Sequence, residues 1–268
     1  MKIALFATPD NGPYVWVAVH DLSVNEGCYR QFRPIHALTF LAQFKAQERN
    51  RQKAFYLGMA LENKLFGVRY FMSQLQEVVT PVSENVYQGH HVAEYAPQQR
   101  VIATLEAYLN SIYSALEIVS QLNRTFHPDL KQGFRRQSER FDLFSFERWE
   151  WLPYFFDLRS ELAHFNTPIP SVQAQKIILE FTNPKDLEVF KKGRYEIAIE
   201  GICSYVSSLF DMLDAWAISE LQSIDPEIEV DVAFEQGWKK PLQNKKVKVR
   251  EILEQFIPAQ PIISPTQP

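Results

Sequence analysis

Two long stretches of the sequence carry apolar residues at steps of three and four, and this spacing constrains the fold more than any other feature. Such a repeat places apolar side chains in one stripe along an α-helix. In the first stretch, about residues 97–127, the stripe consists of Ile102, Leu105, Leu109, Ile112, Leu116, Val119 and Leu122. In the second, about residues 195–221, it consists of Ile202, Val206, Leu209, Leu213 and Trp216. Each stripe has to be buried against another element, so the sequence predicts a mainly α-helical, up-and-down bundle.

A third helical region is expected from residue 34 to about residue 79. Pro34 suits the first position of a helix, and Thr80-Pro81 is expected to end it. Gly58 and Gly67 argue against one straight helix over this whole length.

The remaining elements are shorter. A helical segment is expected between Pro153 and Pro168, with an apolar face that packs on the core. Residues 2–7 and 14–19 read as two strands of an N-terminal β-hairpin, because the loop between them contains Asp-Asn-Gly. Residues 174–182 are expected to form a short inserted β segment.

These elements suggest three parts. Residues 1–30 would be a hairpin extension, residues 31–226 the helical bundle, and residues 227–268 a basic extension with a Pro-rich disordered tail. The basic run is residues 238–250, which contain six Lys and Arg residues and no acidic residue.

Composition narrows the class of protein. The 268 residues carry 28 basic and 32 acidic side chains, and the net charge of −4 excludes a globally cationic nucleic-acid binder while leaving room for a local basic cleft. The two cysteines, Cys28 and Cys203, form no disulfide or zinc pattern and are expected to be reduced. The apolar runs are too short for a secretory signal or a membrane span, so a soluble cytoplasmic protein is expected.

Several familiar catalytic signatures are absent from the sequence. It has no glycine-rich phosphate loop, no Gly-x-Ser-x-Gly elbow, no His-Glu-x-x-His pair and no calcium loop. The sequence therefore gives no support for nucleotide-dependent phosphoryl transfer, serine hydrolysis or zinc proteolysis.

One segment carries credible chemistry, at the end of the helix that precedes Pro168. Arg159 and His164 are separated by four residues, and Ser160 lies one helical turn before His164. Histidine titrates near neutrality and can move a proton to or from a hydroxyl. Arginine stays charged and presents a fork of donors that matches phosphate oxygens. This trio suits attack of a ribose 2′-hydroxyl on the neighbouring phosphate, without a metal or other cofactor.

The segment Arg159-Ser160-Glu161-Leu162-Ala163-His164 resembles the R-x4–6-H motif of the HEPN superfamily. HEPN domains are α-helical bundles, and many are metal-independent endoribonucleases, including toxins and the RNA-cutting parts of defence systems. The resemblance covers about residues 97–222, in pattern only. It implies that Arg159 binds phosphate, that His164 transfers protons or contacts phosphate, and that Ser160 is their polar companion. It also implies a homodimer whose two motifs form one composite site, restrained by an antitoxin-type protein partner.

A basic cluster precedes the motif. Arg135, Arg136 and Arg140 lie in a polar stretch of the sequence. If the substrate is RNA, these side chains are expected to contact its phosphates.

Alternative interpretations remain open from the sequence. The first is a non-catalytic HEPN-like module that holds RNA, a nucleotide or a partner protein with the same Arg and His. The second is a helical metalloprotein using Glu161-x-x-His164, although the chain has no second copy of this pattern. Arg30 and His36 also satisfy the bare motif spacing but straddle Pro34, and His90-His91 is a further pair of ligand-type residues.

Overall fold

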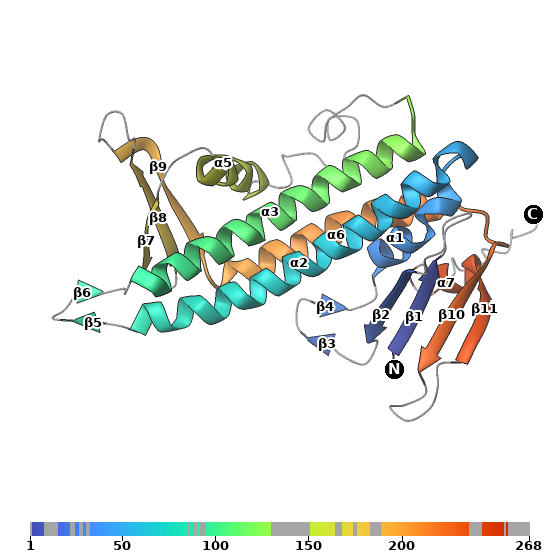
Figure 1. The fold of residues 1–268 in the computed structure, drawn as a ribbon, viewed down its shortest axis with the longest axis horizontal. Coiled ribbons are helices and arrows are strands. Elements are labelled where there is room, and N and C mark those ends of the chain that lie inside the picture. The colour runs from blue at the N-terminus through green and yellow to red at the C-terminus, as the bar shows by residue number, and fades with distance from the viewer. Residues whose placement is uncertain are drawn as a thin grey trace, which may run out of the picture. The chain divides into compact units, whose positions relative to one another are not determined.

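The computed structural model describes residues 2–7, 16–21, 25–26, 29–30, 33–84, 86–87, 90–91, 95–129, 151–163, 168–173, 176–182, 189–235, 243–254 and 256. The described chain is mainly helical, as predicted (Figure 1). It divides into two compact units, one made of Met1–Met59 with Asp211–Pro268 and the other of Ala60–Phe210.

The first unit contains a four-stranded antiparallel sheet. Its strands are β1 (Lys2–Ala7), β2 (Trp16–Asp21), β10 (Glu229–Glu235) and β11 (Gln243–Lys248), in the order β11-β10-β1-β2. The pairing of β1 with β2 confirms the predicted hairpin. Strands β10 and β11 were not predicted, and β1 pairs with β10. The segments 1–30 and 227–268, expected to be separate extensions, therefore contribute strands to one sheet. A two-stranded ladder of β3 (Asn25–Glu26) and β4 (Tyr29–Arg30) follows β2 in the chain.

This unit also contains helices. They are α1 (Pro34–Lys45), the short 3-10 helix η1 (Glu48–Asn50), the start of α2 (Arg51–Glu84), the end of α6 (Gly201–Leu221) and α7 (Val249–Leu253). Pro34 occupies the first turn of α1, as predicted. Every residue from 35 to 43 is buried, so α1 is a core helix rather than an amphipathic surface helix.

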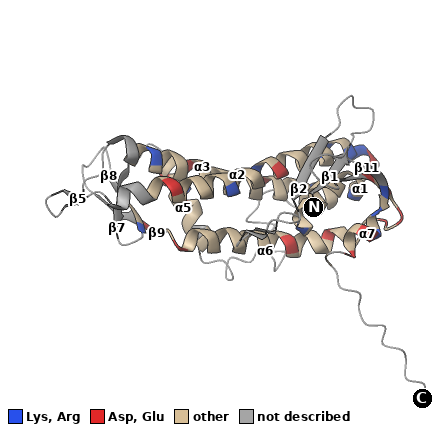
Figure 2. Cartoon of the chain, turned by 90° about the horizontal axis from the view of Figure 1, so that it is seen from below, with Lys and Arg blue, Asp and Glu red and all other residues tan. Residues whose placement is uncertain are grey.

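Ion pairs fix α1 to α6 at both ends of α1. Arg33 pairs with Asp211 and Asp214, and Lys45 pairs with Glu220. The three acidic residues lie on α6, and Figure 2 shows acidic residues in red along this helix. Because residue numbers rise together in these pairs, α1 and this part of α6 run in the same direction.

The region expected to be helical over 34–79 consists of two helices, and the break between them does not lie at a glycine. Helix α1 ends at Lys45, and α2 runs unbroken through both Gly58 and Gly67. Gly58 has a packing role instead. A Cβ atom there would lie 2.1 Å from the carbonyl oxygen of Thr39, so glycine permits the close approach of α1 and α2.

The predicted helix end at Thr80-Pro81 is wrong, because α2 continues to Glu84. Proline has no N–H group, so within a helix it forfeits one backbone hydrogen bond to the preceding turn. Near the carboxyl end of a helix, one further turn can therefore still form after a proline.

The second unit is built around α2 and α3 (Tyr95–Phe126), which are joined by the hairpin of β5 (Val86–Tyr87) and β6 (His90–His91). The two helices lie side by side in Figure 1, and a Cβ atom at Gly67 would lie 3.0 Å from Oγ of Ser111. The predicted stripe of α3 is confirmed, since its members from Leu105 to Leu122 are buried and only Ile102 is half-buried.

Helix α6 starts in this unit and runs antiparallel to α2. Nε2 of Gln76 donates a hydrogen bond to Sγ of Cys203 at 3.2 Å, and the guanidinium of Arg69 lies over the ring of Phe210 at 4.7 Å. All five residues of the second predicted stripe, from Ile202 to Trp216, are buried.

The expected β insertion is a three-stranded antiparallel sheet. Its strands are β7 (Pro168–Gln173), β8 (Lys176–Thr182) and β9 (Val189–Ala198), in that order. Strand β8 matches the prediction, but β7 and β9 were missed. The helix expected from residue 195 begins only at Gly201, because Tyr195 and Ile197 pair with Leu179 and Ile177 in the sheet.

No helix in the described part of the chain is both long and apolar enough to cross a membrane.

Candidate functional site

Helix α5 (Trp151–Ala163) carries the first residues of the predicted motif, and aromatic packing holds it in the second unit. Phe155 is buried and makes edge-to-face contacts with Tyr108 of α3 and Tyr205 of α6. Trp151 packs on Tyr205 as well, at 5.4 Å between ring centroids. The described aromatic residues of this segment therefore serve core packing.

A hydroxyl group fixes α5 to the edge of the β7-β8-β9 sheet. The hydroxyl of Tyr154 accepts a hydrogen bond from the backbone N–H of Glu196 at 2.6 Å and donates one to its carbonyl at 3.1 Å. Strand β9 is an edge strand, so Tyr154 satisfies backbone groups that would otherwise face outward. Burial is the main reason why the pKa of Tyr154 is raised.

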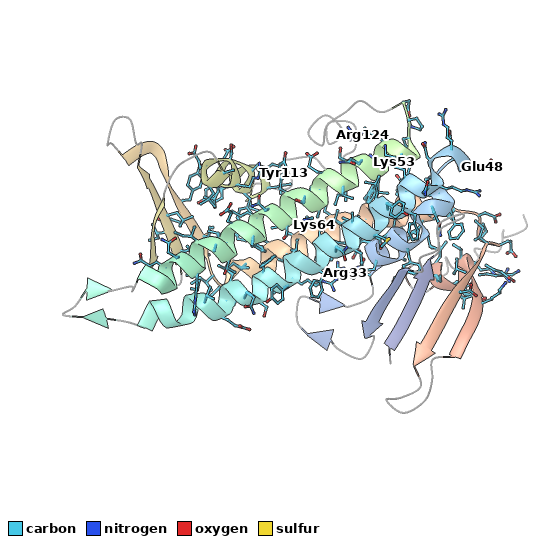
Figure 3. The ribbon with its side chains drawn as sticks, in the orientation of Figure 1. Arg33, Glu48, Lys53, Lys64, Tyr113 and Arg124 are labelled. Carbon is cyan, nitrogen blue, oxygen red and sulfur yellow. The ribbon has the colours of Figure 1, made fainter. Side chains whose placement is uncertain are left out.

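Arg159 lies in the penultimate turn of α5 and is half-buried. Its Nε donates a hydrogen bond to Oδ1 of Asn110 on α3 at 3.1 Å. Its Cζ atom lies 4.4 Å from the ring centroid of Tyr113, which Figure 3 labels on α3 near α5. The guanidinium is therefore held in a defined place by one neutral acceptor and one aromatic face.

The charge of Arg159 is not neutralised within the described residues, where no carboxylate forms an ion pair with it. Asp157, two residues before Arg159, is exposed, and Glu161, two residues after it, is half-buried. Both carboxylates act on Tyr195, whose pKa is raised to about 12 by burial first and then by these negative charges. Asp157 and Glu161 are therefore close enough to Tyr195 on β9 to affect its pKa, and Arg159 contacts Asn110 on α3.

The other predicted site residues are only partly described. Ser160 is exposed on α5, next to Arg159 in the chain. His164 follows Ala163, the last residue of α5, and lies outside the described residues. Arg135, Arg136 and Arg140 lie outside them too.

Arg30 and His36, the other pair with the spacing of the motif, do not lie in one helix. Arg30 ends strand β4, and His36 is buried in the first turn of α1. His90 and His91 form strand β6. Across the ranges that the structure describes, no group of three or more His, Cys, Asp or Glu side chains is arranged to hold a metal ion.

The described part of the basic run 238–250 is largely paired with acidic residues. Glu227 forms ion pairs with Lys248 and Arg250, and Lys246 lies 3.9 Å from Glu229. The hydrogen bond from Lys248 lowers the pKa of the Glu227 carboxyl. This part of the run therefore offers less free positive charge than the sequence suggested.

Asn110 and Tyr113 were missed by the sequence analysis. They are three positions apart, on one face of α3, and lie between members of its apolar stripe. A polar side chain beside a stripe is usual at the border of a helix face. Only the packing of α5 on α3 shows that both residues contact Arg159.

Comparisons with known proteins add no relative: no protein-family model, no curated protein and no solved structure matches the chain.

Proposed function

We propose that the protein is a HEPN-like, metal-independent endoribonuclease in which Arg159 binds the scissile phosphate and His164 transfers protons. The observation that carries this proposal is the state of Arg159. Its guanidinium is half-buried, fixed by Asn110 and Tyr113, and has no carboxylate partner among the described residues. A fixed positive charge without a counter-ion is what an anionic substrate requires.

The position of His164 in the sequence supports a role in proton transfer. It directly follows the last residue of α5, five positions after Arg159. Cycling between both protonation states near neutral pH is the property that acid–base catalysis needs.

The proposed reaction needs only the RNA itself. The 2′-oxygen attacks the adjacent phosphorus and loses its proton, while the bond from phosphorus to the 5′-oxygen breaks and that oxygen gains a proton. His164 serves these proton transfers, and Arg159 stabilises the negative charge that accumulates on the phosphate oxygens. The products are a 2′,3′-cyclic phosphate and a 5′-hydroxyl.

Other parts of the hypothesis come from the resemblance. Two copies of the chain would join their motifs in one site, with Ser160 as a polar companion. Apart from the resemblance, the charge of Arg135, Arg136 and Arg140, which precede the motif in the sequence, suits them to contact RNA phosphates. The exposure of Ser160 is compatible with contact to a substrate or a second copy. An antitoxin-type partner and a cytoplasmic location remain predictions.

Cleavage of labelled single-stranded RNA by the full chain tests the proposal. Arg159→Ala and His164→Ala should each lower the rate by at least about a hundredfold, the size expected for loss of a charge-stabilising or acid–base group. EDTA should have no effect, and mass spectrometry should find cyclic-phosphate ends. Arg100→Ala is the matched control, because Arg100 is an exposed arginine of α3. Undiminished cleavage by both motif variants would refute the proposal.

A second candidate function is a non-catalytic module that binds RNA phosphate. The three-stranded sheet β7-β8-β9 between α5 and α6 favours it, because HEPN enzymes often connect the motif to their last helix by a short turn. The net charge of −4 favours it too. RNA binding that depends on Arg159 without any cleavage product would support this alternative.

A further inference from the structure

The two α3 residues that contact Arg159 use different parts of its guanidinium. Asn110 takes the hydrogen bond from Nε, and the ring of Tyr113 lies against the guanidinium at 4.4 Å from Cζ. A guanidinium has five N–H donors, one on Nε and four on the two terminal nitrogens. Within the described residues the four terminal donors form no hydrogen bond or ion pair.

Because Asn110 and Tyr113 use only Nε and the face of the guanidinium, the edge formed by its two terminal nitrogens is available for a phosphate. The two terminal nitrogens present parallel N–H bonds, which match two oxygens of one phosphate group. With Nε bonded to Asn110, the side-on mode through Nε and one terminal nitrogen is blocked. The terminal edge is the part that remains for a bidentate contact.

We propose that Asn110 and Tyr113 are positioning residues that turn the terminal edge of Arg159 towards the phosphodiester, and that the neutral amide of Asn110 is required for phosphate binding. This inference rests on the proposed function. It adds two residues outside the motif and states how each acts.

The proposal depends on the side chain of Asn110 being uncharged. Its carbonyl oxygen accepts the Nε hydrogen bond without bringing a negative charge. An aspartate at the same place would accept the same bond, but its carboxylate would neutralise Arg159 and compete with the phosphate. The ring of Tyr113 likewise stabilises the cation from its face and leaves the donors in the guanidinium plane free.

Asn110→Asp therefore separates positioning from a purely structural role. The variant keeps the hydrogen bond, so the free energy of unfolding should stay close to that of the wild type. Its affinity for RNA should nevertheless fall by about tenfold or more, as expected when a charge-assisted contact is lost. Asn63→Asp is the matched control, because it adds the same charge on the exposed face of α2.

The order of the RNA affinities of two variants gives a second test of the role of Asn110. Asn110→Ala removes the acceptor but leaves the charge of Arg159 intact, so it should bind RNA better than Asn110→Asp. A purely structural role predicts the reverse order, because only the aspartate retains the hydrogen bond. Tyr113→Leu should weaken RNA binding without adding charge.

The probe is a fully 2′-O-methylated RNA oligonucleotide, which has no 2′-hydroxyl to attack and so reports binding alone. Fluorescence anisotropy at several salt concentrations gives the dissociation constant and its salt dependence. For both Arg159→Ala and Asn110→Asp, the slope of log affinity against log salt should become shallower by about 0.7, the value for one phosphate contact to a single strand. A fluorogenic RNA cleavage assay then gives kcat and KM, and Asn110→Asp should act mainly on KM.

The outcomes separate the two proposals. If Arg159→Ala abolishes cleavage and Asn110→Asp binds RNA as the wild type does, the role of Asn110 is overturned and the proposed function stands. If Arg159→Ala cleaves and binds like the wild type, the proposed function fails, and the role of Asn110 fails with it. If RNA is bound through Arg159 but never cut, the enzymatic proposal fails, and the effect of Asn110→Asp on binding still decides the role of Asn110.

Discussion

The backbone N–H of Ile35 donates a hydrogen bond to Oδ1 of Asp214 at 3.0 Å, although the two residues are 179 positions apart in the chain. The other carboxylate oxygen accepts a hydrogen bond from Nε of Arg33. Asp214 on α6 thus satisfies a free N–H group in the first turn of α1 and pairs with the residue just before that helix. Arg33, labelled in Figure 3, and Asp214 are both mostly buried, with side chains 13% and 14% exposed.

Replacing Asp214 should therefore be costly. Asp214→Ala removes the less exposed of the two carboxylates that pair with Arg33 and the acceptor of the Ile35 N–H, so we expect a loss of about 3 kcal/mol or more in the free energy of unfolding. Urea unfolding followed by circular dichroism measures this loss. Asp211→Ala is the control, because that side chain is 69% exposed and its ion pair should contribute at most about 1 kcal/mol. Equal losses in both variants would contradict the assigned role.

A methyl group at Gly58 should destabilise the first unit. Alanine normally favours a helix over glycine by about 1 kcal/mol, but here its Cβ would lie 2.1 Å from the carbonyl oxygen of Thr39. The backbone cannot yield as a side chain can, so we expect Gly58→Ala to cost about 1–3 kcal/mol. Gly67→Ala meets the hydroxyl of Ser111 at 3.0 Å instead, and should cost clearly less. Thermal unfolding of both variants makes the comparison.

Truncation of two neighbouring residues of α2 should reduce stability to very different extents. Leu65 is fully buried, whereas Phe66 is 68% exposed and stacks on Tyr70. Leu65→Ala should cost about 2–5 kcal/mol because it opens a cavity, and Phe66→Ala should cost less than about 1 kcal/mol. A large loss for Phe66→Ala in chemical unfolding would mean that its ring is covered in solution.

The buried phenol of Tyr195 should make the free energy of unfolding depend on pH in the alkaline range. Burial, with the charges of Glu161 and Asp157, raises its pKa from 10.0 to about 12. Between these values the folded protein keeps a proton that the unfolded chain has lost. The stabilisation is therefore complete below pH 10 and is lost as pH rises through about 12. Over this range the wild type should lose stability more steeply than Tyr195→Phe, which has no proton to lose. Equal slopes in urea unfolding at several pH values would argue against the shift.

The parts of the fold that were predicted correctly are those set by local periodicity. The stripes of α3 and α6 repeat within a few residues, so one helix determines its own apolar face. The same holds for the β1-β2 hairpin, whose strands lie close together in sequence. Strands β10 and β11 were missed because β10 pairs with β1, and no local signal marks a partner so distant in the chain.

The site shows the same limit. The motif segment could be proposed from the sequence because arginine, serine and histidine are residue types with recognised chemistry. Asn110 and Tyr113 carry no such signal, and their importance depends on how α5 packs against α3. From the sequence, Gly58 was taken as evidence against one straight helix, but in the structure glycine is needed at this position because Thr39 of α1 lies so close to it.

The pairing of β1 with β10 has a consequence for synthesis on the ribosome. Residues 2–7 emerge before residues 229–235, so the pairing of β1 with β10 has to wait until the later segment has been made. The second unit, residues 60–210, is translated completely in that interval and can fold first. During this delay the edge of β1 lacks its neighbour, and unpaired backbone N–H and C=O groups at a strand edge are open to pairing with another chain.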